Sequence, residues 1–149
     1  MITSNSRKWP SAAALLCLLT VLSACDGETP GQVGVQTAIS TGGMLYESEG
    51  CANCHGPEGG GDVGPDLTGV LDTFPACETQ VEWVSLGSAR WAQDRGSAYG
   101  ATNKPVRGGM PGFGSRLAED QIRKIASFTR SRFAGGDAIS IVQDCLARG

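Results

Sequence analysis

The chain has 149 residues, a length typical of one small domain, and its formal net charge at pH 7 is −3. The charge is unevenly divided along the sequence: residues 25–89 hold ten acidic and no basic residues, and residues 90–149 hold ten basic and five acidic ones. Because nucleic-acid-binding domains concentrate positive charge, this composition argues against DNA or RNA as a partner.

The first 24 residues are predicted to be an export signal and not part of the fold. Two basic residues precede an apolar run over residues 12–22, which is too short to cross a bilayer as a permanent helix. The run ends in Leu22-Ser23-Ala24-Cys25, which resembles the lipobox of bacterial lipoproteins. That resemblance implies a lipidated Cys25 and attachment to the extracytoplasmic face of a bacterial membrane. The alternative is an ordinary signal peptide that is cut nearby and leaves a free thiol.

Loss of residues 1–24 would leave 149 − 24 = 125 residues with a net charge of 10 − 15 = −5. Residues 25–40 are predicted to form a flexible tether, because they include Asp26, Glu28 and Pro30 and show no sustained periodicity. A tether of this length spans on the order of 20 Å between its ends. A short ordered arm packed on the domain is the alternative. The folded domain would then comprise residues 41–149.

A helix is predicted from about Thr41, as its N-cap, to about Gly50. Gly42 and Tyr46 are four residues apart and therefore share one face of this helix. Glycine at this position would let a second helix approach closely, and Tyr46 would add aromatic area beside it. Met44 is predicted to lie in the core.

The next residues carry the clearest chemical signal in the sequence. Cys51, Cys54 and His55 form a Cys-x-x-Cys-His run, which is the attachment signature of a c-type haem. Each thiol can form a thioether with a haem vinyl group. His55, the one histidine in the sequence, is then placed to ligate the iron.

Three alternatives compete for these residues. A thioredoxin-like redox pair requires a βαβ context, which the surrounding pattern lacks. A structural zinc site needs four ligands, and the sequence has no second Cys-x-x-Cys pair and no second histidine. A disulfide between Cys51 and Cys54 would leave the adjacent His55 unexplained. Haem attachment is therefore the favoured interpretation.

A glycine-rich loop follows at residues 56–64. The carbonyl of Pro65, just after it, is predicted to accept the Nδ1 proton of His55 and so to fix the imidazole ring. Four apolar residues are expected either to cover the porphyrin or to belong to the ordinary core: Leu67, Val70, Leu71 and Phe74.

A second helix is predicted from Glu78 to about Ser88, followed by a long loop over residues 87–109. A loop of this length in a small domain is usually functional, and Trp91 or Tyr99 could pack on the haem or donate to a propionate.

Met110 closes this loop, in the sequence Met110-Pro111-Gly112-Phe113-Gly114. A glycine-rich loop leaves the thioether of Met110 free of helical constraints, and we expect it to be the second iron ligand. The alternative is a methionine that merely fills space between other side chains.

A long helix is predicted over residues 117–133, ended by two glycines at 135 and 136, and a short helix over residues 137–146. Ile122, Ile125 and Phe128 fall on one side of the long helix. Four basic residues are expected elsewhere on the surface: Arg123, Lys124, Arg130 and Arg132.

Together these segments resemble a class I, single-haem c-type cytochrome. The resemblance covers residues 41–133 and rests on Gly42–Tyr46, Cys51–His55, Gly64–Leu67, Met110–Phe113 and Leu117–Phe128. It implies an all-α fold of three to five helices around one covalently bound haem, with the first and last helices crossing near Gly42, Tyr46 and Phe128. It also implies His55 and Met110 as the axial ligands of the iron, with Pro65 and Leu67 beside the haem.

Two features depart from the family pattern. Ala118 occupies an N-cap position where Ser or Thr is frequent, which costs the helix about 1 kcal/mol. Cys77 and Cys145 lie outside the general pattern and are the remaining pair after the other assignments. Because an exported compartment is oxidising, they are predicted to form a disulfide, with two unlinked buried thiols as the alternative.

The expected function is one-electron transfer in an extracytoplasmic, membrane-tethered respiratory chain, with no catalytic residues. The partner would be a redox protein such as an oxidase, a reductase or another cytochrome. The chain would act either as a free-standing shuttle or as the subunit through which electrons enter such a complex. The alternative is a haem enzyme or gas-binding protein in which Met110 is not a ligand.

Overall fold

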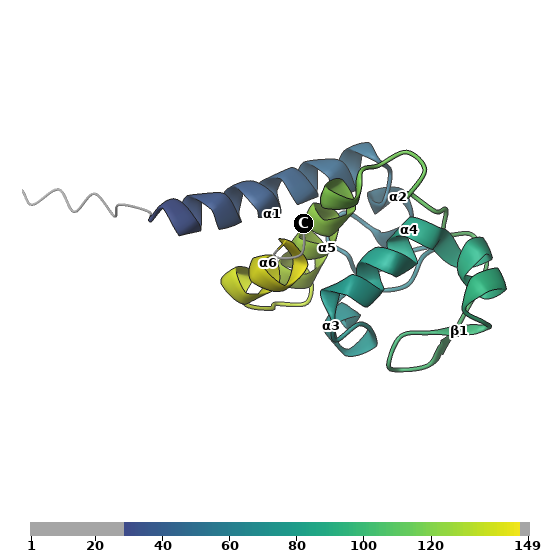
Figure 1. Cartoon of the computed structure of the whole chain (residues 1–149). Helices are drawn as coiled ribbons and strands as arrows, with labels where there is room; N and C mark the ends of the chain where they lie inside the picture. Colours follow the sequence, from purple (N-terminus) through teal and green to yellow (C-terminus); the bar gives the residue numbers. More distant parts are fainter. Residues whose placement is uncertain (1–28, 147–149) are drawn as a thin grey trace, which may run out of the picture.

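The computed structural model describes residues 29–146, which fold into six helices and one β-hairpin (Figure 1). The elements are α1 (Pro30–Ser48), α2 (Ala52–His55), α3 (Val70–Thr73), α4 (Cys77–Asp94), β1 (Ala98–Tyr99), β2 (Lys104–Pro105), α5 (Glu119–Arg132) and α6 (Ala138–Leu146). The predicted all-α fold is confirmed, and the helix count exceeds the predicted three to five because α2 and α3 are single turns. No helix within residues 29–146 is long and apolar enough to cross a membrane.

α1 begins at Pro30 and not at Thr41. Its N-terminus is fixed by a capping box: the Thr29 hydroxyl accepts from the Gln32 N–H at 3.4 Å, and the Gln32 side chain accepts from the Thr29 N–H at 3.0 Å. Thr41 lies inside the helix, where its hydroxyl donates to the carbonyl of Thr37. The predicted flexible tether is therefore wrong for residues 30–40. Residues 1–28, with the predicted signal and Cys25, lie outside the described part of the chain.

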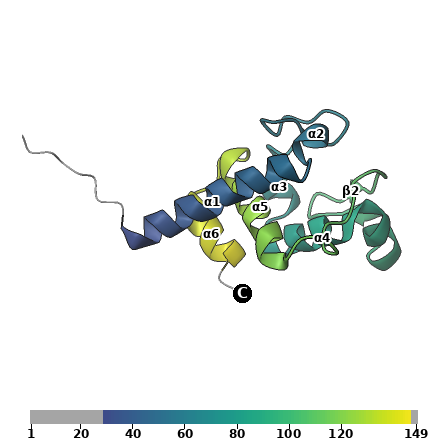
Figure 2. The same ribbon diagram turned by 90° about the horizontal axis from the view of Figure 1, so that it is seen from above.

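α1 and α5 cross at Gly42, as predicted. A Cβ at Gly42 would overlap the Lys124 carbonyl of α5 and lie 2.9 Å from Cβ of Phe128. Tyr46, one turn later, is 1% exposed and packs against Phe128 and Phe133, with ring centroids 5.6 and 5.2 Å away. Seen from above, α1 lies across α5 and α6 (Figure 2).

The prediction that Met44 lies in the core is wrong. Its side chain is 63% exposed. Met44 is two residues from both Gly42 and Tyr46, a spacing that places it away from the face that contacts α5.

α4 follows the predicted second helix as far as Gly87, where the backbone leaves helical geometry at φ 68°, ψ 174°. The predicted loop over residues 87–109 is wrong in two places. Helical structure resumes after Gly87 and continues to Asp94, and β1 and β2 then pair antiparallel, with Tyr99 opposite Lys104. The turn at Gly87 brings the chain against the Met110 loop, since the Ser88 N–H donates to the Met110 carbonyl at 3.0 Å.

α5 has the predicted apolar side, with Ile122 and Ile125 buried, but two of its basic residues do not lie on the surface. Arg123 is 5% exposed and donates to the Cys145 carbonyl at 3.0 Å and to Glu78 at 2.8 Å. Arg130 is 3% exposed and donates to two backbone carbonyls just before α4, those of Phe74 and Pro75. Both arginines can be buried because their guanidinium groups donate hydrogen bonds to backbone carbonyls at the ends of neighbouring elements.

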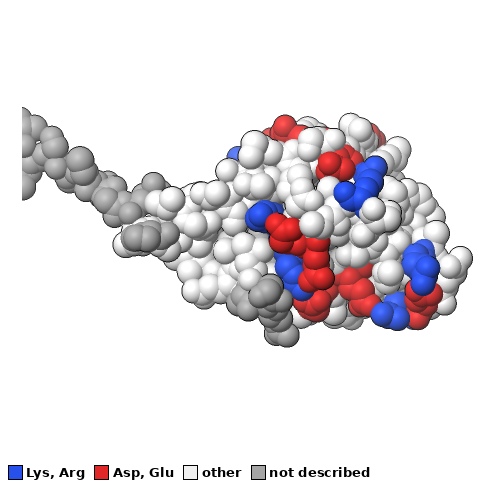
Figure 3. Space-filling view, turned by 45° about the horizontal axis from the view of Figure 1, so that its top comes forward, with Lys and Arg blue, Asp and Glu red and all other residues white. Residues whose placement is uncertain are grey.

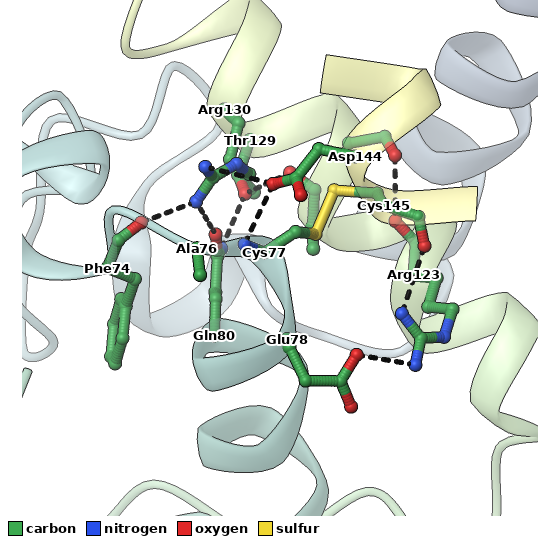
Figure 4. The surroundings of a disulfide bond; sticks show 12 residues. Phe74, Ala76, Cys77, Glu78, Gln80, Arg123, Thr129, Arg130, Asp144 and Cys145 are labelled. Atoms are coloured by element: carbon green, nitrogen blue, oxygen red, sulfur yellow. Dashed lines mark hydrogen bonds and ion pairs between the residues drawn. A yellow bond between two sulfur atoms is a disulfide. The ribbon is translucent and has the colours of Figure 1, made fainter. Parts of the chain in front are cut away.

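The structure contains the predicted disulfide between Cys77 and Cys145, which joins the start of α4 to α6 (Figure 4). Both cysteines are fully buried. Asp144, beside Cys145, accepts from the backbone N–H of Cys77 at 3.0 Å and lies 3.8 Å from Arg130. The disulfide, the carboxylate and the buried arginines therefore form one connected cluster that holds α4, α5 and α6 together.

The crossing at Gly42 generates a matched pair of substitutions. Gly42→Ala forces α1 away from α5 and is expected to lower the free energy of unfolding by about 1–3 kcal/mol. Gly34→Ala, on the same helix, meets nothing within 4 Å and is expected to be neutral or stabilising by up to about 1 kcal/mol. Denaturant titration of the two variants measures both effects. Equal stabilities would contradict the close contact.

The disulfide closes a loop of 68 residues. Its removal in the double variant Cys77→Ala, Cys145→Ala is expected to lower the free energy of unfolding by about 4 kcal/mol, mainly by freeing the unfolded chain. Chemical denaturation followed by circular dichroism measures this loss. A loss below about 1 kcal/mol would show that the link constrains little.

Candidate functional site

The Cys-x-x-Cys-His run follows the end of α1 and lies on one side of the domain. Gly50, at φ 79°, turns the chain, and the Cys51 N–H donates to the Tyr46 carbonyl at 3.0 Å. The single-turn helix α2 follows at once. Cys51, its N-cap, and Cys54 are three residues apart and therefore lie on the same face of this turn. Both thiols are half-buried and form no disulfide.

The His55 ring is held by the predicted hydrogen bond. Its Nδ1 lies 2.8 Å from the carbonyl oxygen of Pro65, which can only accept a proton, so Nδ1 carries the hydrogen. The lone pair of Nε2 is then free to bind a metal. A Cβ at Gly64 would lie 3.1 Å from Nδ1, so a glycine beside the ring leaves it room.

The glycine-rich loop folds back on α2 and supports it. The Gly61 N–H donates to the His55 carbonyl at 2.9 Å, and the Gly64 N–H donates to the Cys54 carbonyl at 2.8 Å. The Tyr46 hydroxyl donates to the Gly56 carbonyl at 2.7 Å. These bonds satisfy the last carbonyls of the short helix and fix the loop that carries Pro65.

A cavity opens beside α2 and extends into the core. Eight residues line both its inner and its outer part: Cys51, His55, Pro65, Trp83, Tyr99, Lys104, Met110 and Phe113. The inner part is also lined by Leu67, Val70 and Phe74, and the outer part by Cys54. Leu71, the fourth residue of the predicted apolar cover, does not line the cavity, because its side chain lies against Gly136.

Aromatic rings form one wall of the cavity. Tyr99 stacks on Trp83 with ring centroids 4.0 Å apart, and Phe74 stacks on Tyr99 at 5.9 Å. Trp91, the other aromatic residue proposed for the site, lies behind this wall: it meets Trp83 edge-on, and its Nε1 donates to the Ala98 carbonyl. Burial raises the pKa of Tyr99 above its ordinary value.

Met110 reaches the cavity from a loop that is anchored at several points. Its carbonyl accepts from both the N–H and the hydroxyl of Ser88, at 3.0 and 3.1 Å. Three residues later, the Phe113 N–H donates to the Val84 carbonyl at 3.0 Å. The loop is therefore fixed to both halves of α4, on either side of Gly87, and Met110 lines the same cavity as His55.

Sequence reasoning missed Trp83 and Lys104 as residues of the site. Trp83 lies three residues from Gln80 on α4, and both line the cavity, so the helical period could have placed it there once the face was known. Lys104 offered no such signal, because its position depends on the β1–β2 hairpin, which the sequence did not predict.

Burial disfavours the charged form of two groups that line the inner part of the cavity, Cys51 and Tyr46. Burial raises the pKa of the Cys51 thiol to about 11, and burial, with a smaller effect of the two cysteines, raises that of Tyr46 to about 12. Both groups are therefore neutral at pH 7.

The acidic and basic halves of the sequence do not form separate faces of the molecule. Arg95, Arg116 and Arg123 of the basic half form ion pairs with Glu82, Glu49 and Glu78 of the acidic half. Acidic and basic side chains accordingly lie side by side in Figure 3.

The donor set suits a haem. One imidazole nitrogen, one thioether sulfur and two thiols line a single, largely apolar cavity, which is what an iron porphyrin attached through two sulfurs requires. Among residues 29–146 there is no group of three or more His, Cys, Asp or Glu side chains that could hold a metal ion by itself. The residues present therefore fit the porphyrin-bound iron that the sequence predicts.

Comparison with known proteins gives one family. The family model described as cytochrome c matches residues 39–132. The crystal structure of cytochrome cL from Hyphomicrobium denitrificans is similar with 22% sequence identity and a TM-score of 0.45. The match covers 69% of this chain and 58% of that one, so the chain spans less than two thirds of that structure. No curated protein matches the sequence.

Proposed function

The chain belongs to the cytochrome c family, and we propose that it carries one electron at a time with a haem attached to Cys51 and Cys54 and ligated by His55 and Met110. Family membership implies covalently bound haem c and haem-based electron transfer. One observation supports this ligand set: four residues from two distant segments, Cys51, Cys54, His55 and Met110, line the same cavity.

When bound, the haem supplies an iron that takes up and releases one electron. The protein holds the two proposed ligands in place. His55 is oriented by the Pro65 carbonyl, and the Met110 backbone is fixed by Ser88. Residues held this way move little when the charge of the site changes, which favours fast electron transfer. A thioether ligand also raises the reduction potential relative to a second imidazole.

The cavity walls determine how open the site is to water. Leu67, Val70, Phe74 and Phe113 exclude water from the inner part, and exclusion of water strengthens every electrostatic interaction within it. In the outer part, Lys104 and Arg107 are the two basic lining residues, and they would balance the negative charge of the propionate groups of a bound haem.

The proposed location is the extracytoplasmic face of a bacterial membrane, with Cys25 as the lipid anchor. The support for it is the lipobox-like sequence at residues 22–25 and the apolar run before it. The proposed partner is a redox protein of a respiratory chain, and the support for it is that cytochromes c act with redox partners.

Substitution of Met110 tests the ligand set. Met110→Ala should leave the haem attached, lower the reduction potential and open the sixth position of the iron. Carbon monoxide should then bind the ferrous protein readily, as followed by absorption spectroscopy. Met44→Ala is the matched control, because Met44 is exposed and does not line the cavity. An unchanged spectrum and potential in Met110→Ala would show that another residue is the ligand.

Substitution of Cys25 tests the anchor. Cys25→Ser should release the protein from membranes with its haem spectrum intact, because the proposed lipid is attached to this residue. Fractionation of cells that produce the wild type and the variant measures the change. A variant that stays in the membrane fraction would show that a protein partner, and not the lipid, holds the chain there.

A further inference from the structure

The first turns of α1 extend beyond the core of the domain. Figure 1 shows this end of α1 projecting past the other elements, and Figure 2 shows the same from above. Residues 31–34 are exposed, and a Cβ on Gly31 or Gly34 would meet nothing within 4 Å. Glycines without packing contacts weaken a helix, so this part of α1 would gain stability from a surface outside the domain.

This end of the molecule also lacks charge. Residues 29–46 include no Asp, Glu, Lys or Arg, whereas residues 47–146 include 13 acidic and 9 basic residues. Within residues 29–46 the exposed large apolar side chains are Val33, which is 48% exposed, and Met44, which is 63% exposed; Ile139 on α6 is 45% exposed. Figure 3 shows the contrast, because the surface next to the grey N-terminal segment is mostly white and the charged side chains gather farther along.

The sequence places the proposed anchor close to these turns. Only the four residues 26–29 separate Cys25 from the first residue of α1. The five Cα–Cα steps from Cys25 to Pro30 extend over at most about 18 Å, so a lipid on Cys25 keeps the start of α1 within that distance of the bilayer. Residues 30–38 of α1 precede the part of the chain that matches the cytochrome c family model, so the family fold does not account for them.

We propose that residues 31–37 of α1 rest on the surface of the bilayer that holds Cys25; this inference depends on the proposed lipidation. The segment suits a lipid interface because Val33 supplies apolar area, Gln32 and Gln36 can hydrogen-bond to headgroups, and no charged group has to lose water. A weak contact is enough, because the anchor keeps the segment at high local concentration beside the lipid.

The consequence is a haem cavity held at a fixed height above the membrane. α1 has 19 residues and is therefore about 28 Å long, and its far end leads directly into Cys51. With the first turns seated on lipid, the rigid helix sets the distance between the bilayer and the cavity. A partner must then present its own redox centre at that height.

Hydrogen exchange of the lipidated, haem-loaded protein tests the contact. The protein is bound to vesicles of phosphatidylethanolamine and phosphatidylglycerol and compared with the soluble Cys25→Ser variant. Amides of residues 31–37 should exchange at least tenfold more slowly on vesicles, while those of α5 should be unchanged. Equal rates for residues 31–37 in the two samples would overturn the proposal.

Two substitutions on one helix locate the contact. Val33→Glu should abolish the slower exchange on vesicles, since a carboxylate at this position resists burial in lipid. Met44→Glu is the control: Met44 is exposed, lies eleven residues later and so nearly on the same face, and is about 16 Å farther along the axis. Met44→Glu should keep the slower exchange. Equal loss in both variants would overturn the assignment to the first two turns.

Other causes of protection give different results. If the Cys25→Ser variant shows the same slow exchange in concentrated solution, with a dimer in analytical ultracentrifugation, a second copy covers the segment and the lipid contact is wrong. The mass of the N-terminal peptide shows separately whether Cys25 is lipidated. A missing lipid would overturn both the anchor and the contact, whereas a lipid without protection would overturn the contact alone.

Discussion

Gly42 has no side chain, and this lets the backbone of α1 touch the Lys124 carbonyl of α5. The contact fixes α1 against the core, and the site residues follow directly after the last turn of α1. One turn after Gly42, Tyr46 is buried between Phe128 and Phe133, and its hydroxyl holds the Gly56 carbonyl. The segment between Tyr46 and Gly56 contains Cys51, Cys54 and His55. The position of the proposed haem-binding residues therefore depends on how closely the two helices pack.

The second half of the site depends on an interruption in a helix. α4 breaks at Gly87, where a Cβ would lie 2.8 Å from Cα of Gly112. The break lets the Met110 loop pack against α4 and be fixed by Ser88. His55 is thus positioned by α1 and its following loop, and Met110 by α4. The disulfide cluster around Cys77 and Cys145 ties the start of α4 to α5 and α6, and Ile125 and Thr129 of α5 line the inner part of the cavity.

Local patterns in the sequence predicted the parts of the fold that depend on local chemistry. The Cys-x-x-Cys-His run, the Gly42–Tyr46 spacing and the end of α5 just before Gly135, which has a positive φ, are such features, and the structure has all three. The start of α1 was missed because the glycines near it obscured the capping box at Thr29. The burial of Arg123 and Arg130 and the place of Lys104 depend on carbonyls and strands brought together only by the fold. No periodicity in the sequence encodes these contacts.

The most direct test of the account is the absorption spectrum of the purified, haem-loaded protein in its ferric and ferrous forms. Histidine and methionine ligation predicts a low-spin haem in both states and, in the ferric form, a weak band near the red end of the spectrum from the thioether–iron bond. A one-electron redox titration should convert the two forms reversibly. A ferric protein that is high-spin and lacks the thioether band would contradict the proposed role of Met110, and with it the assignment as a simple electron carrier.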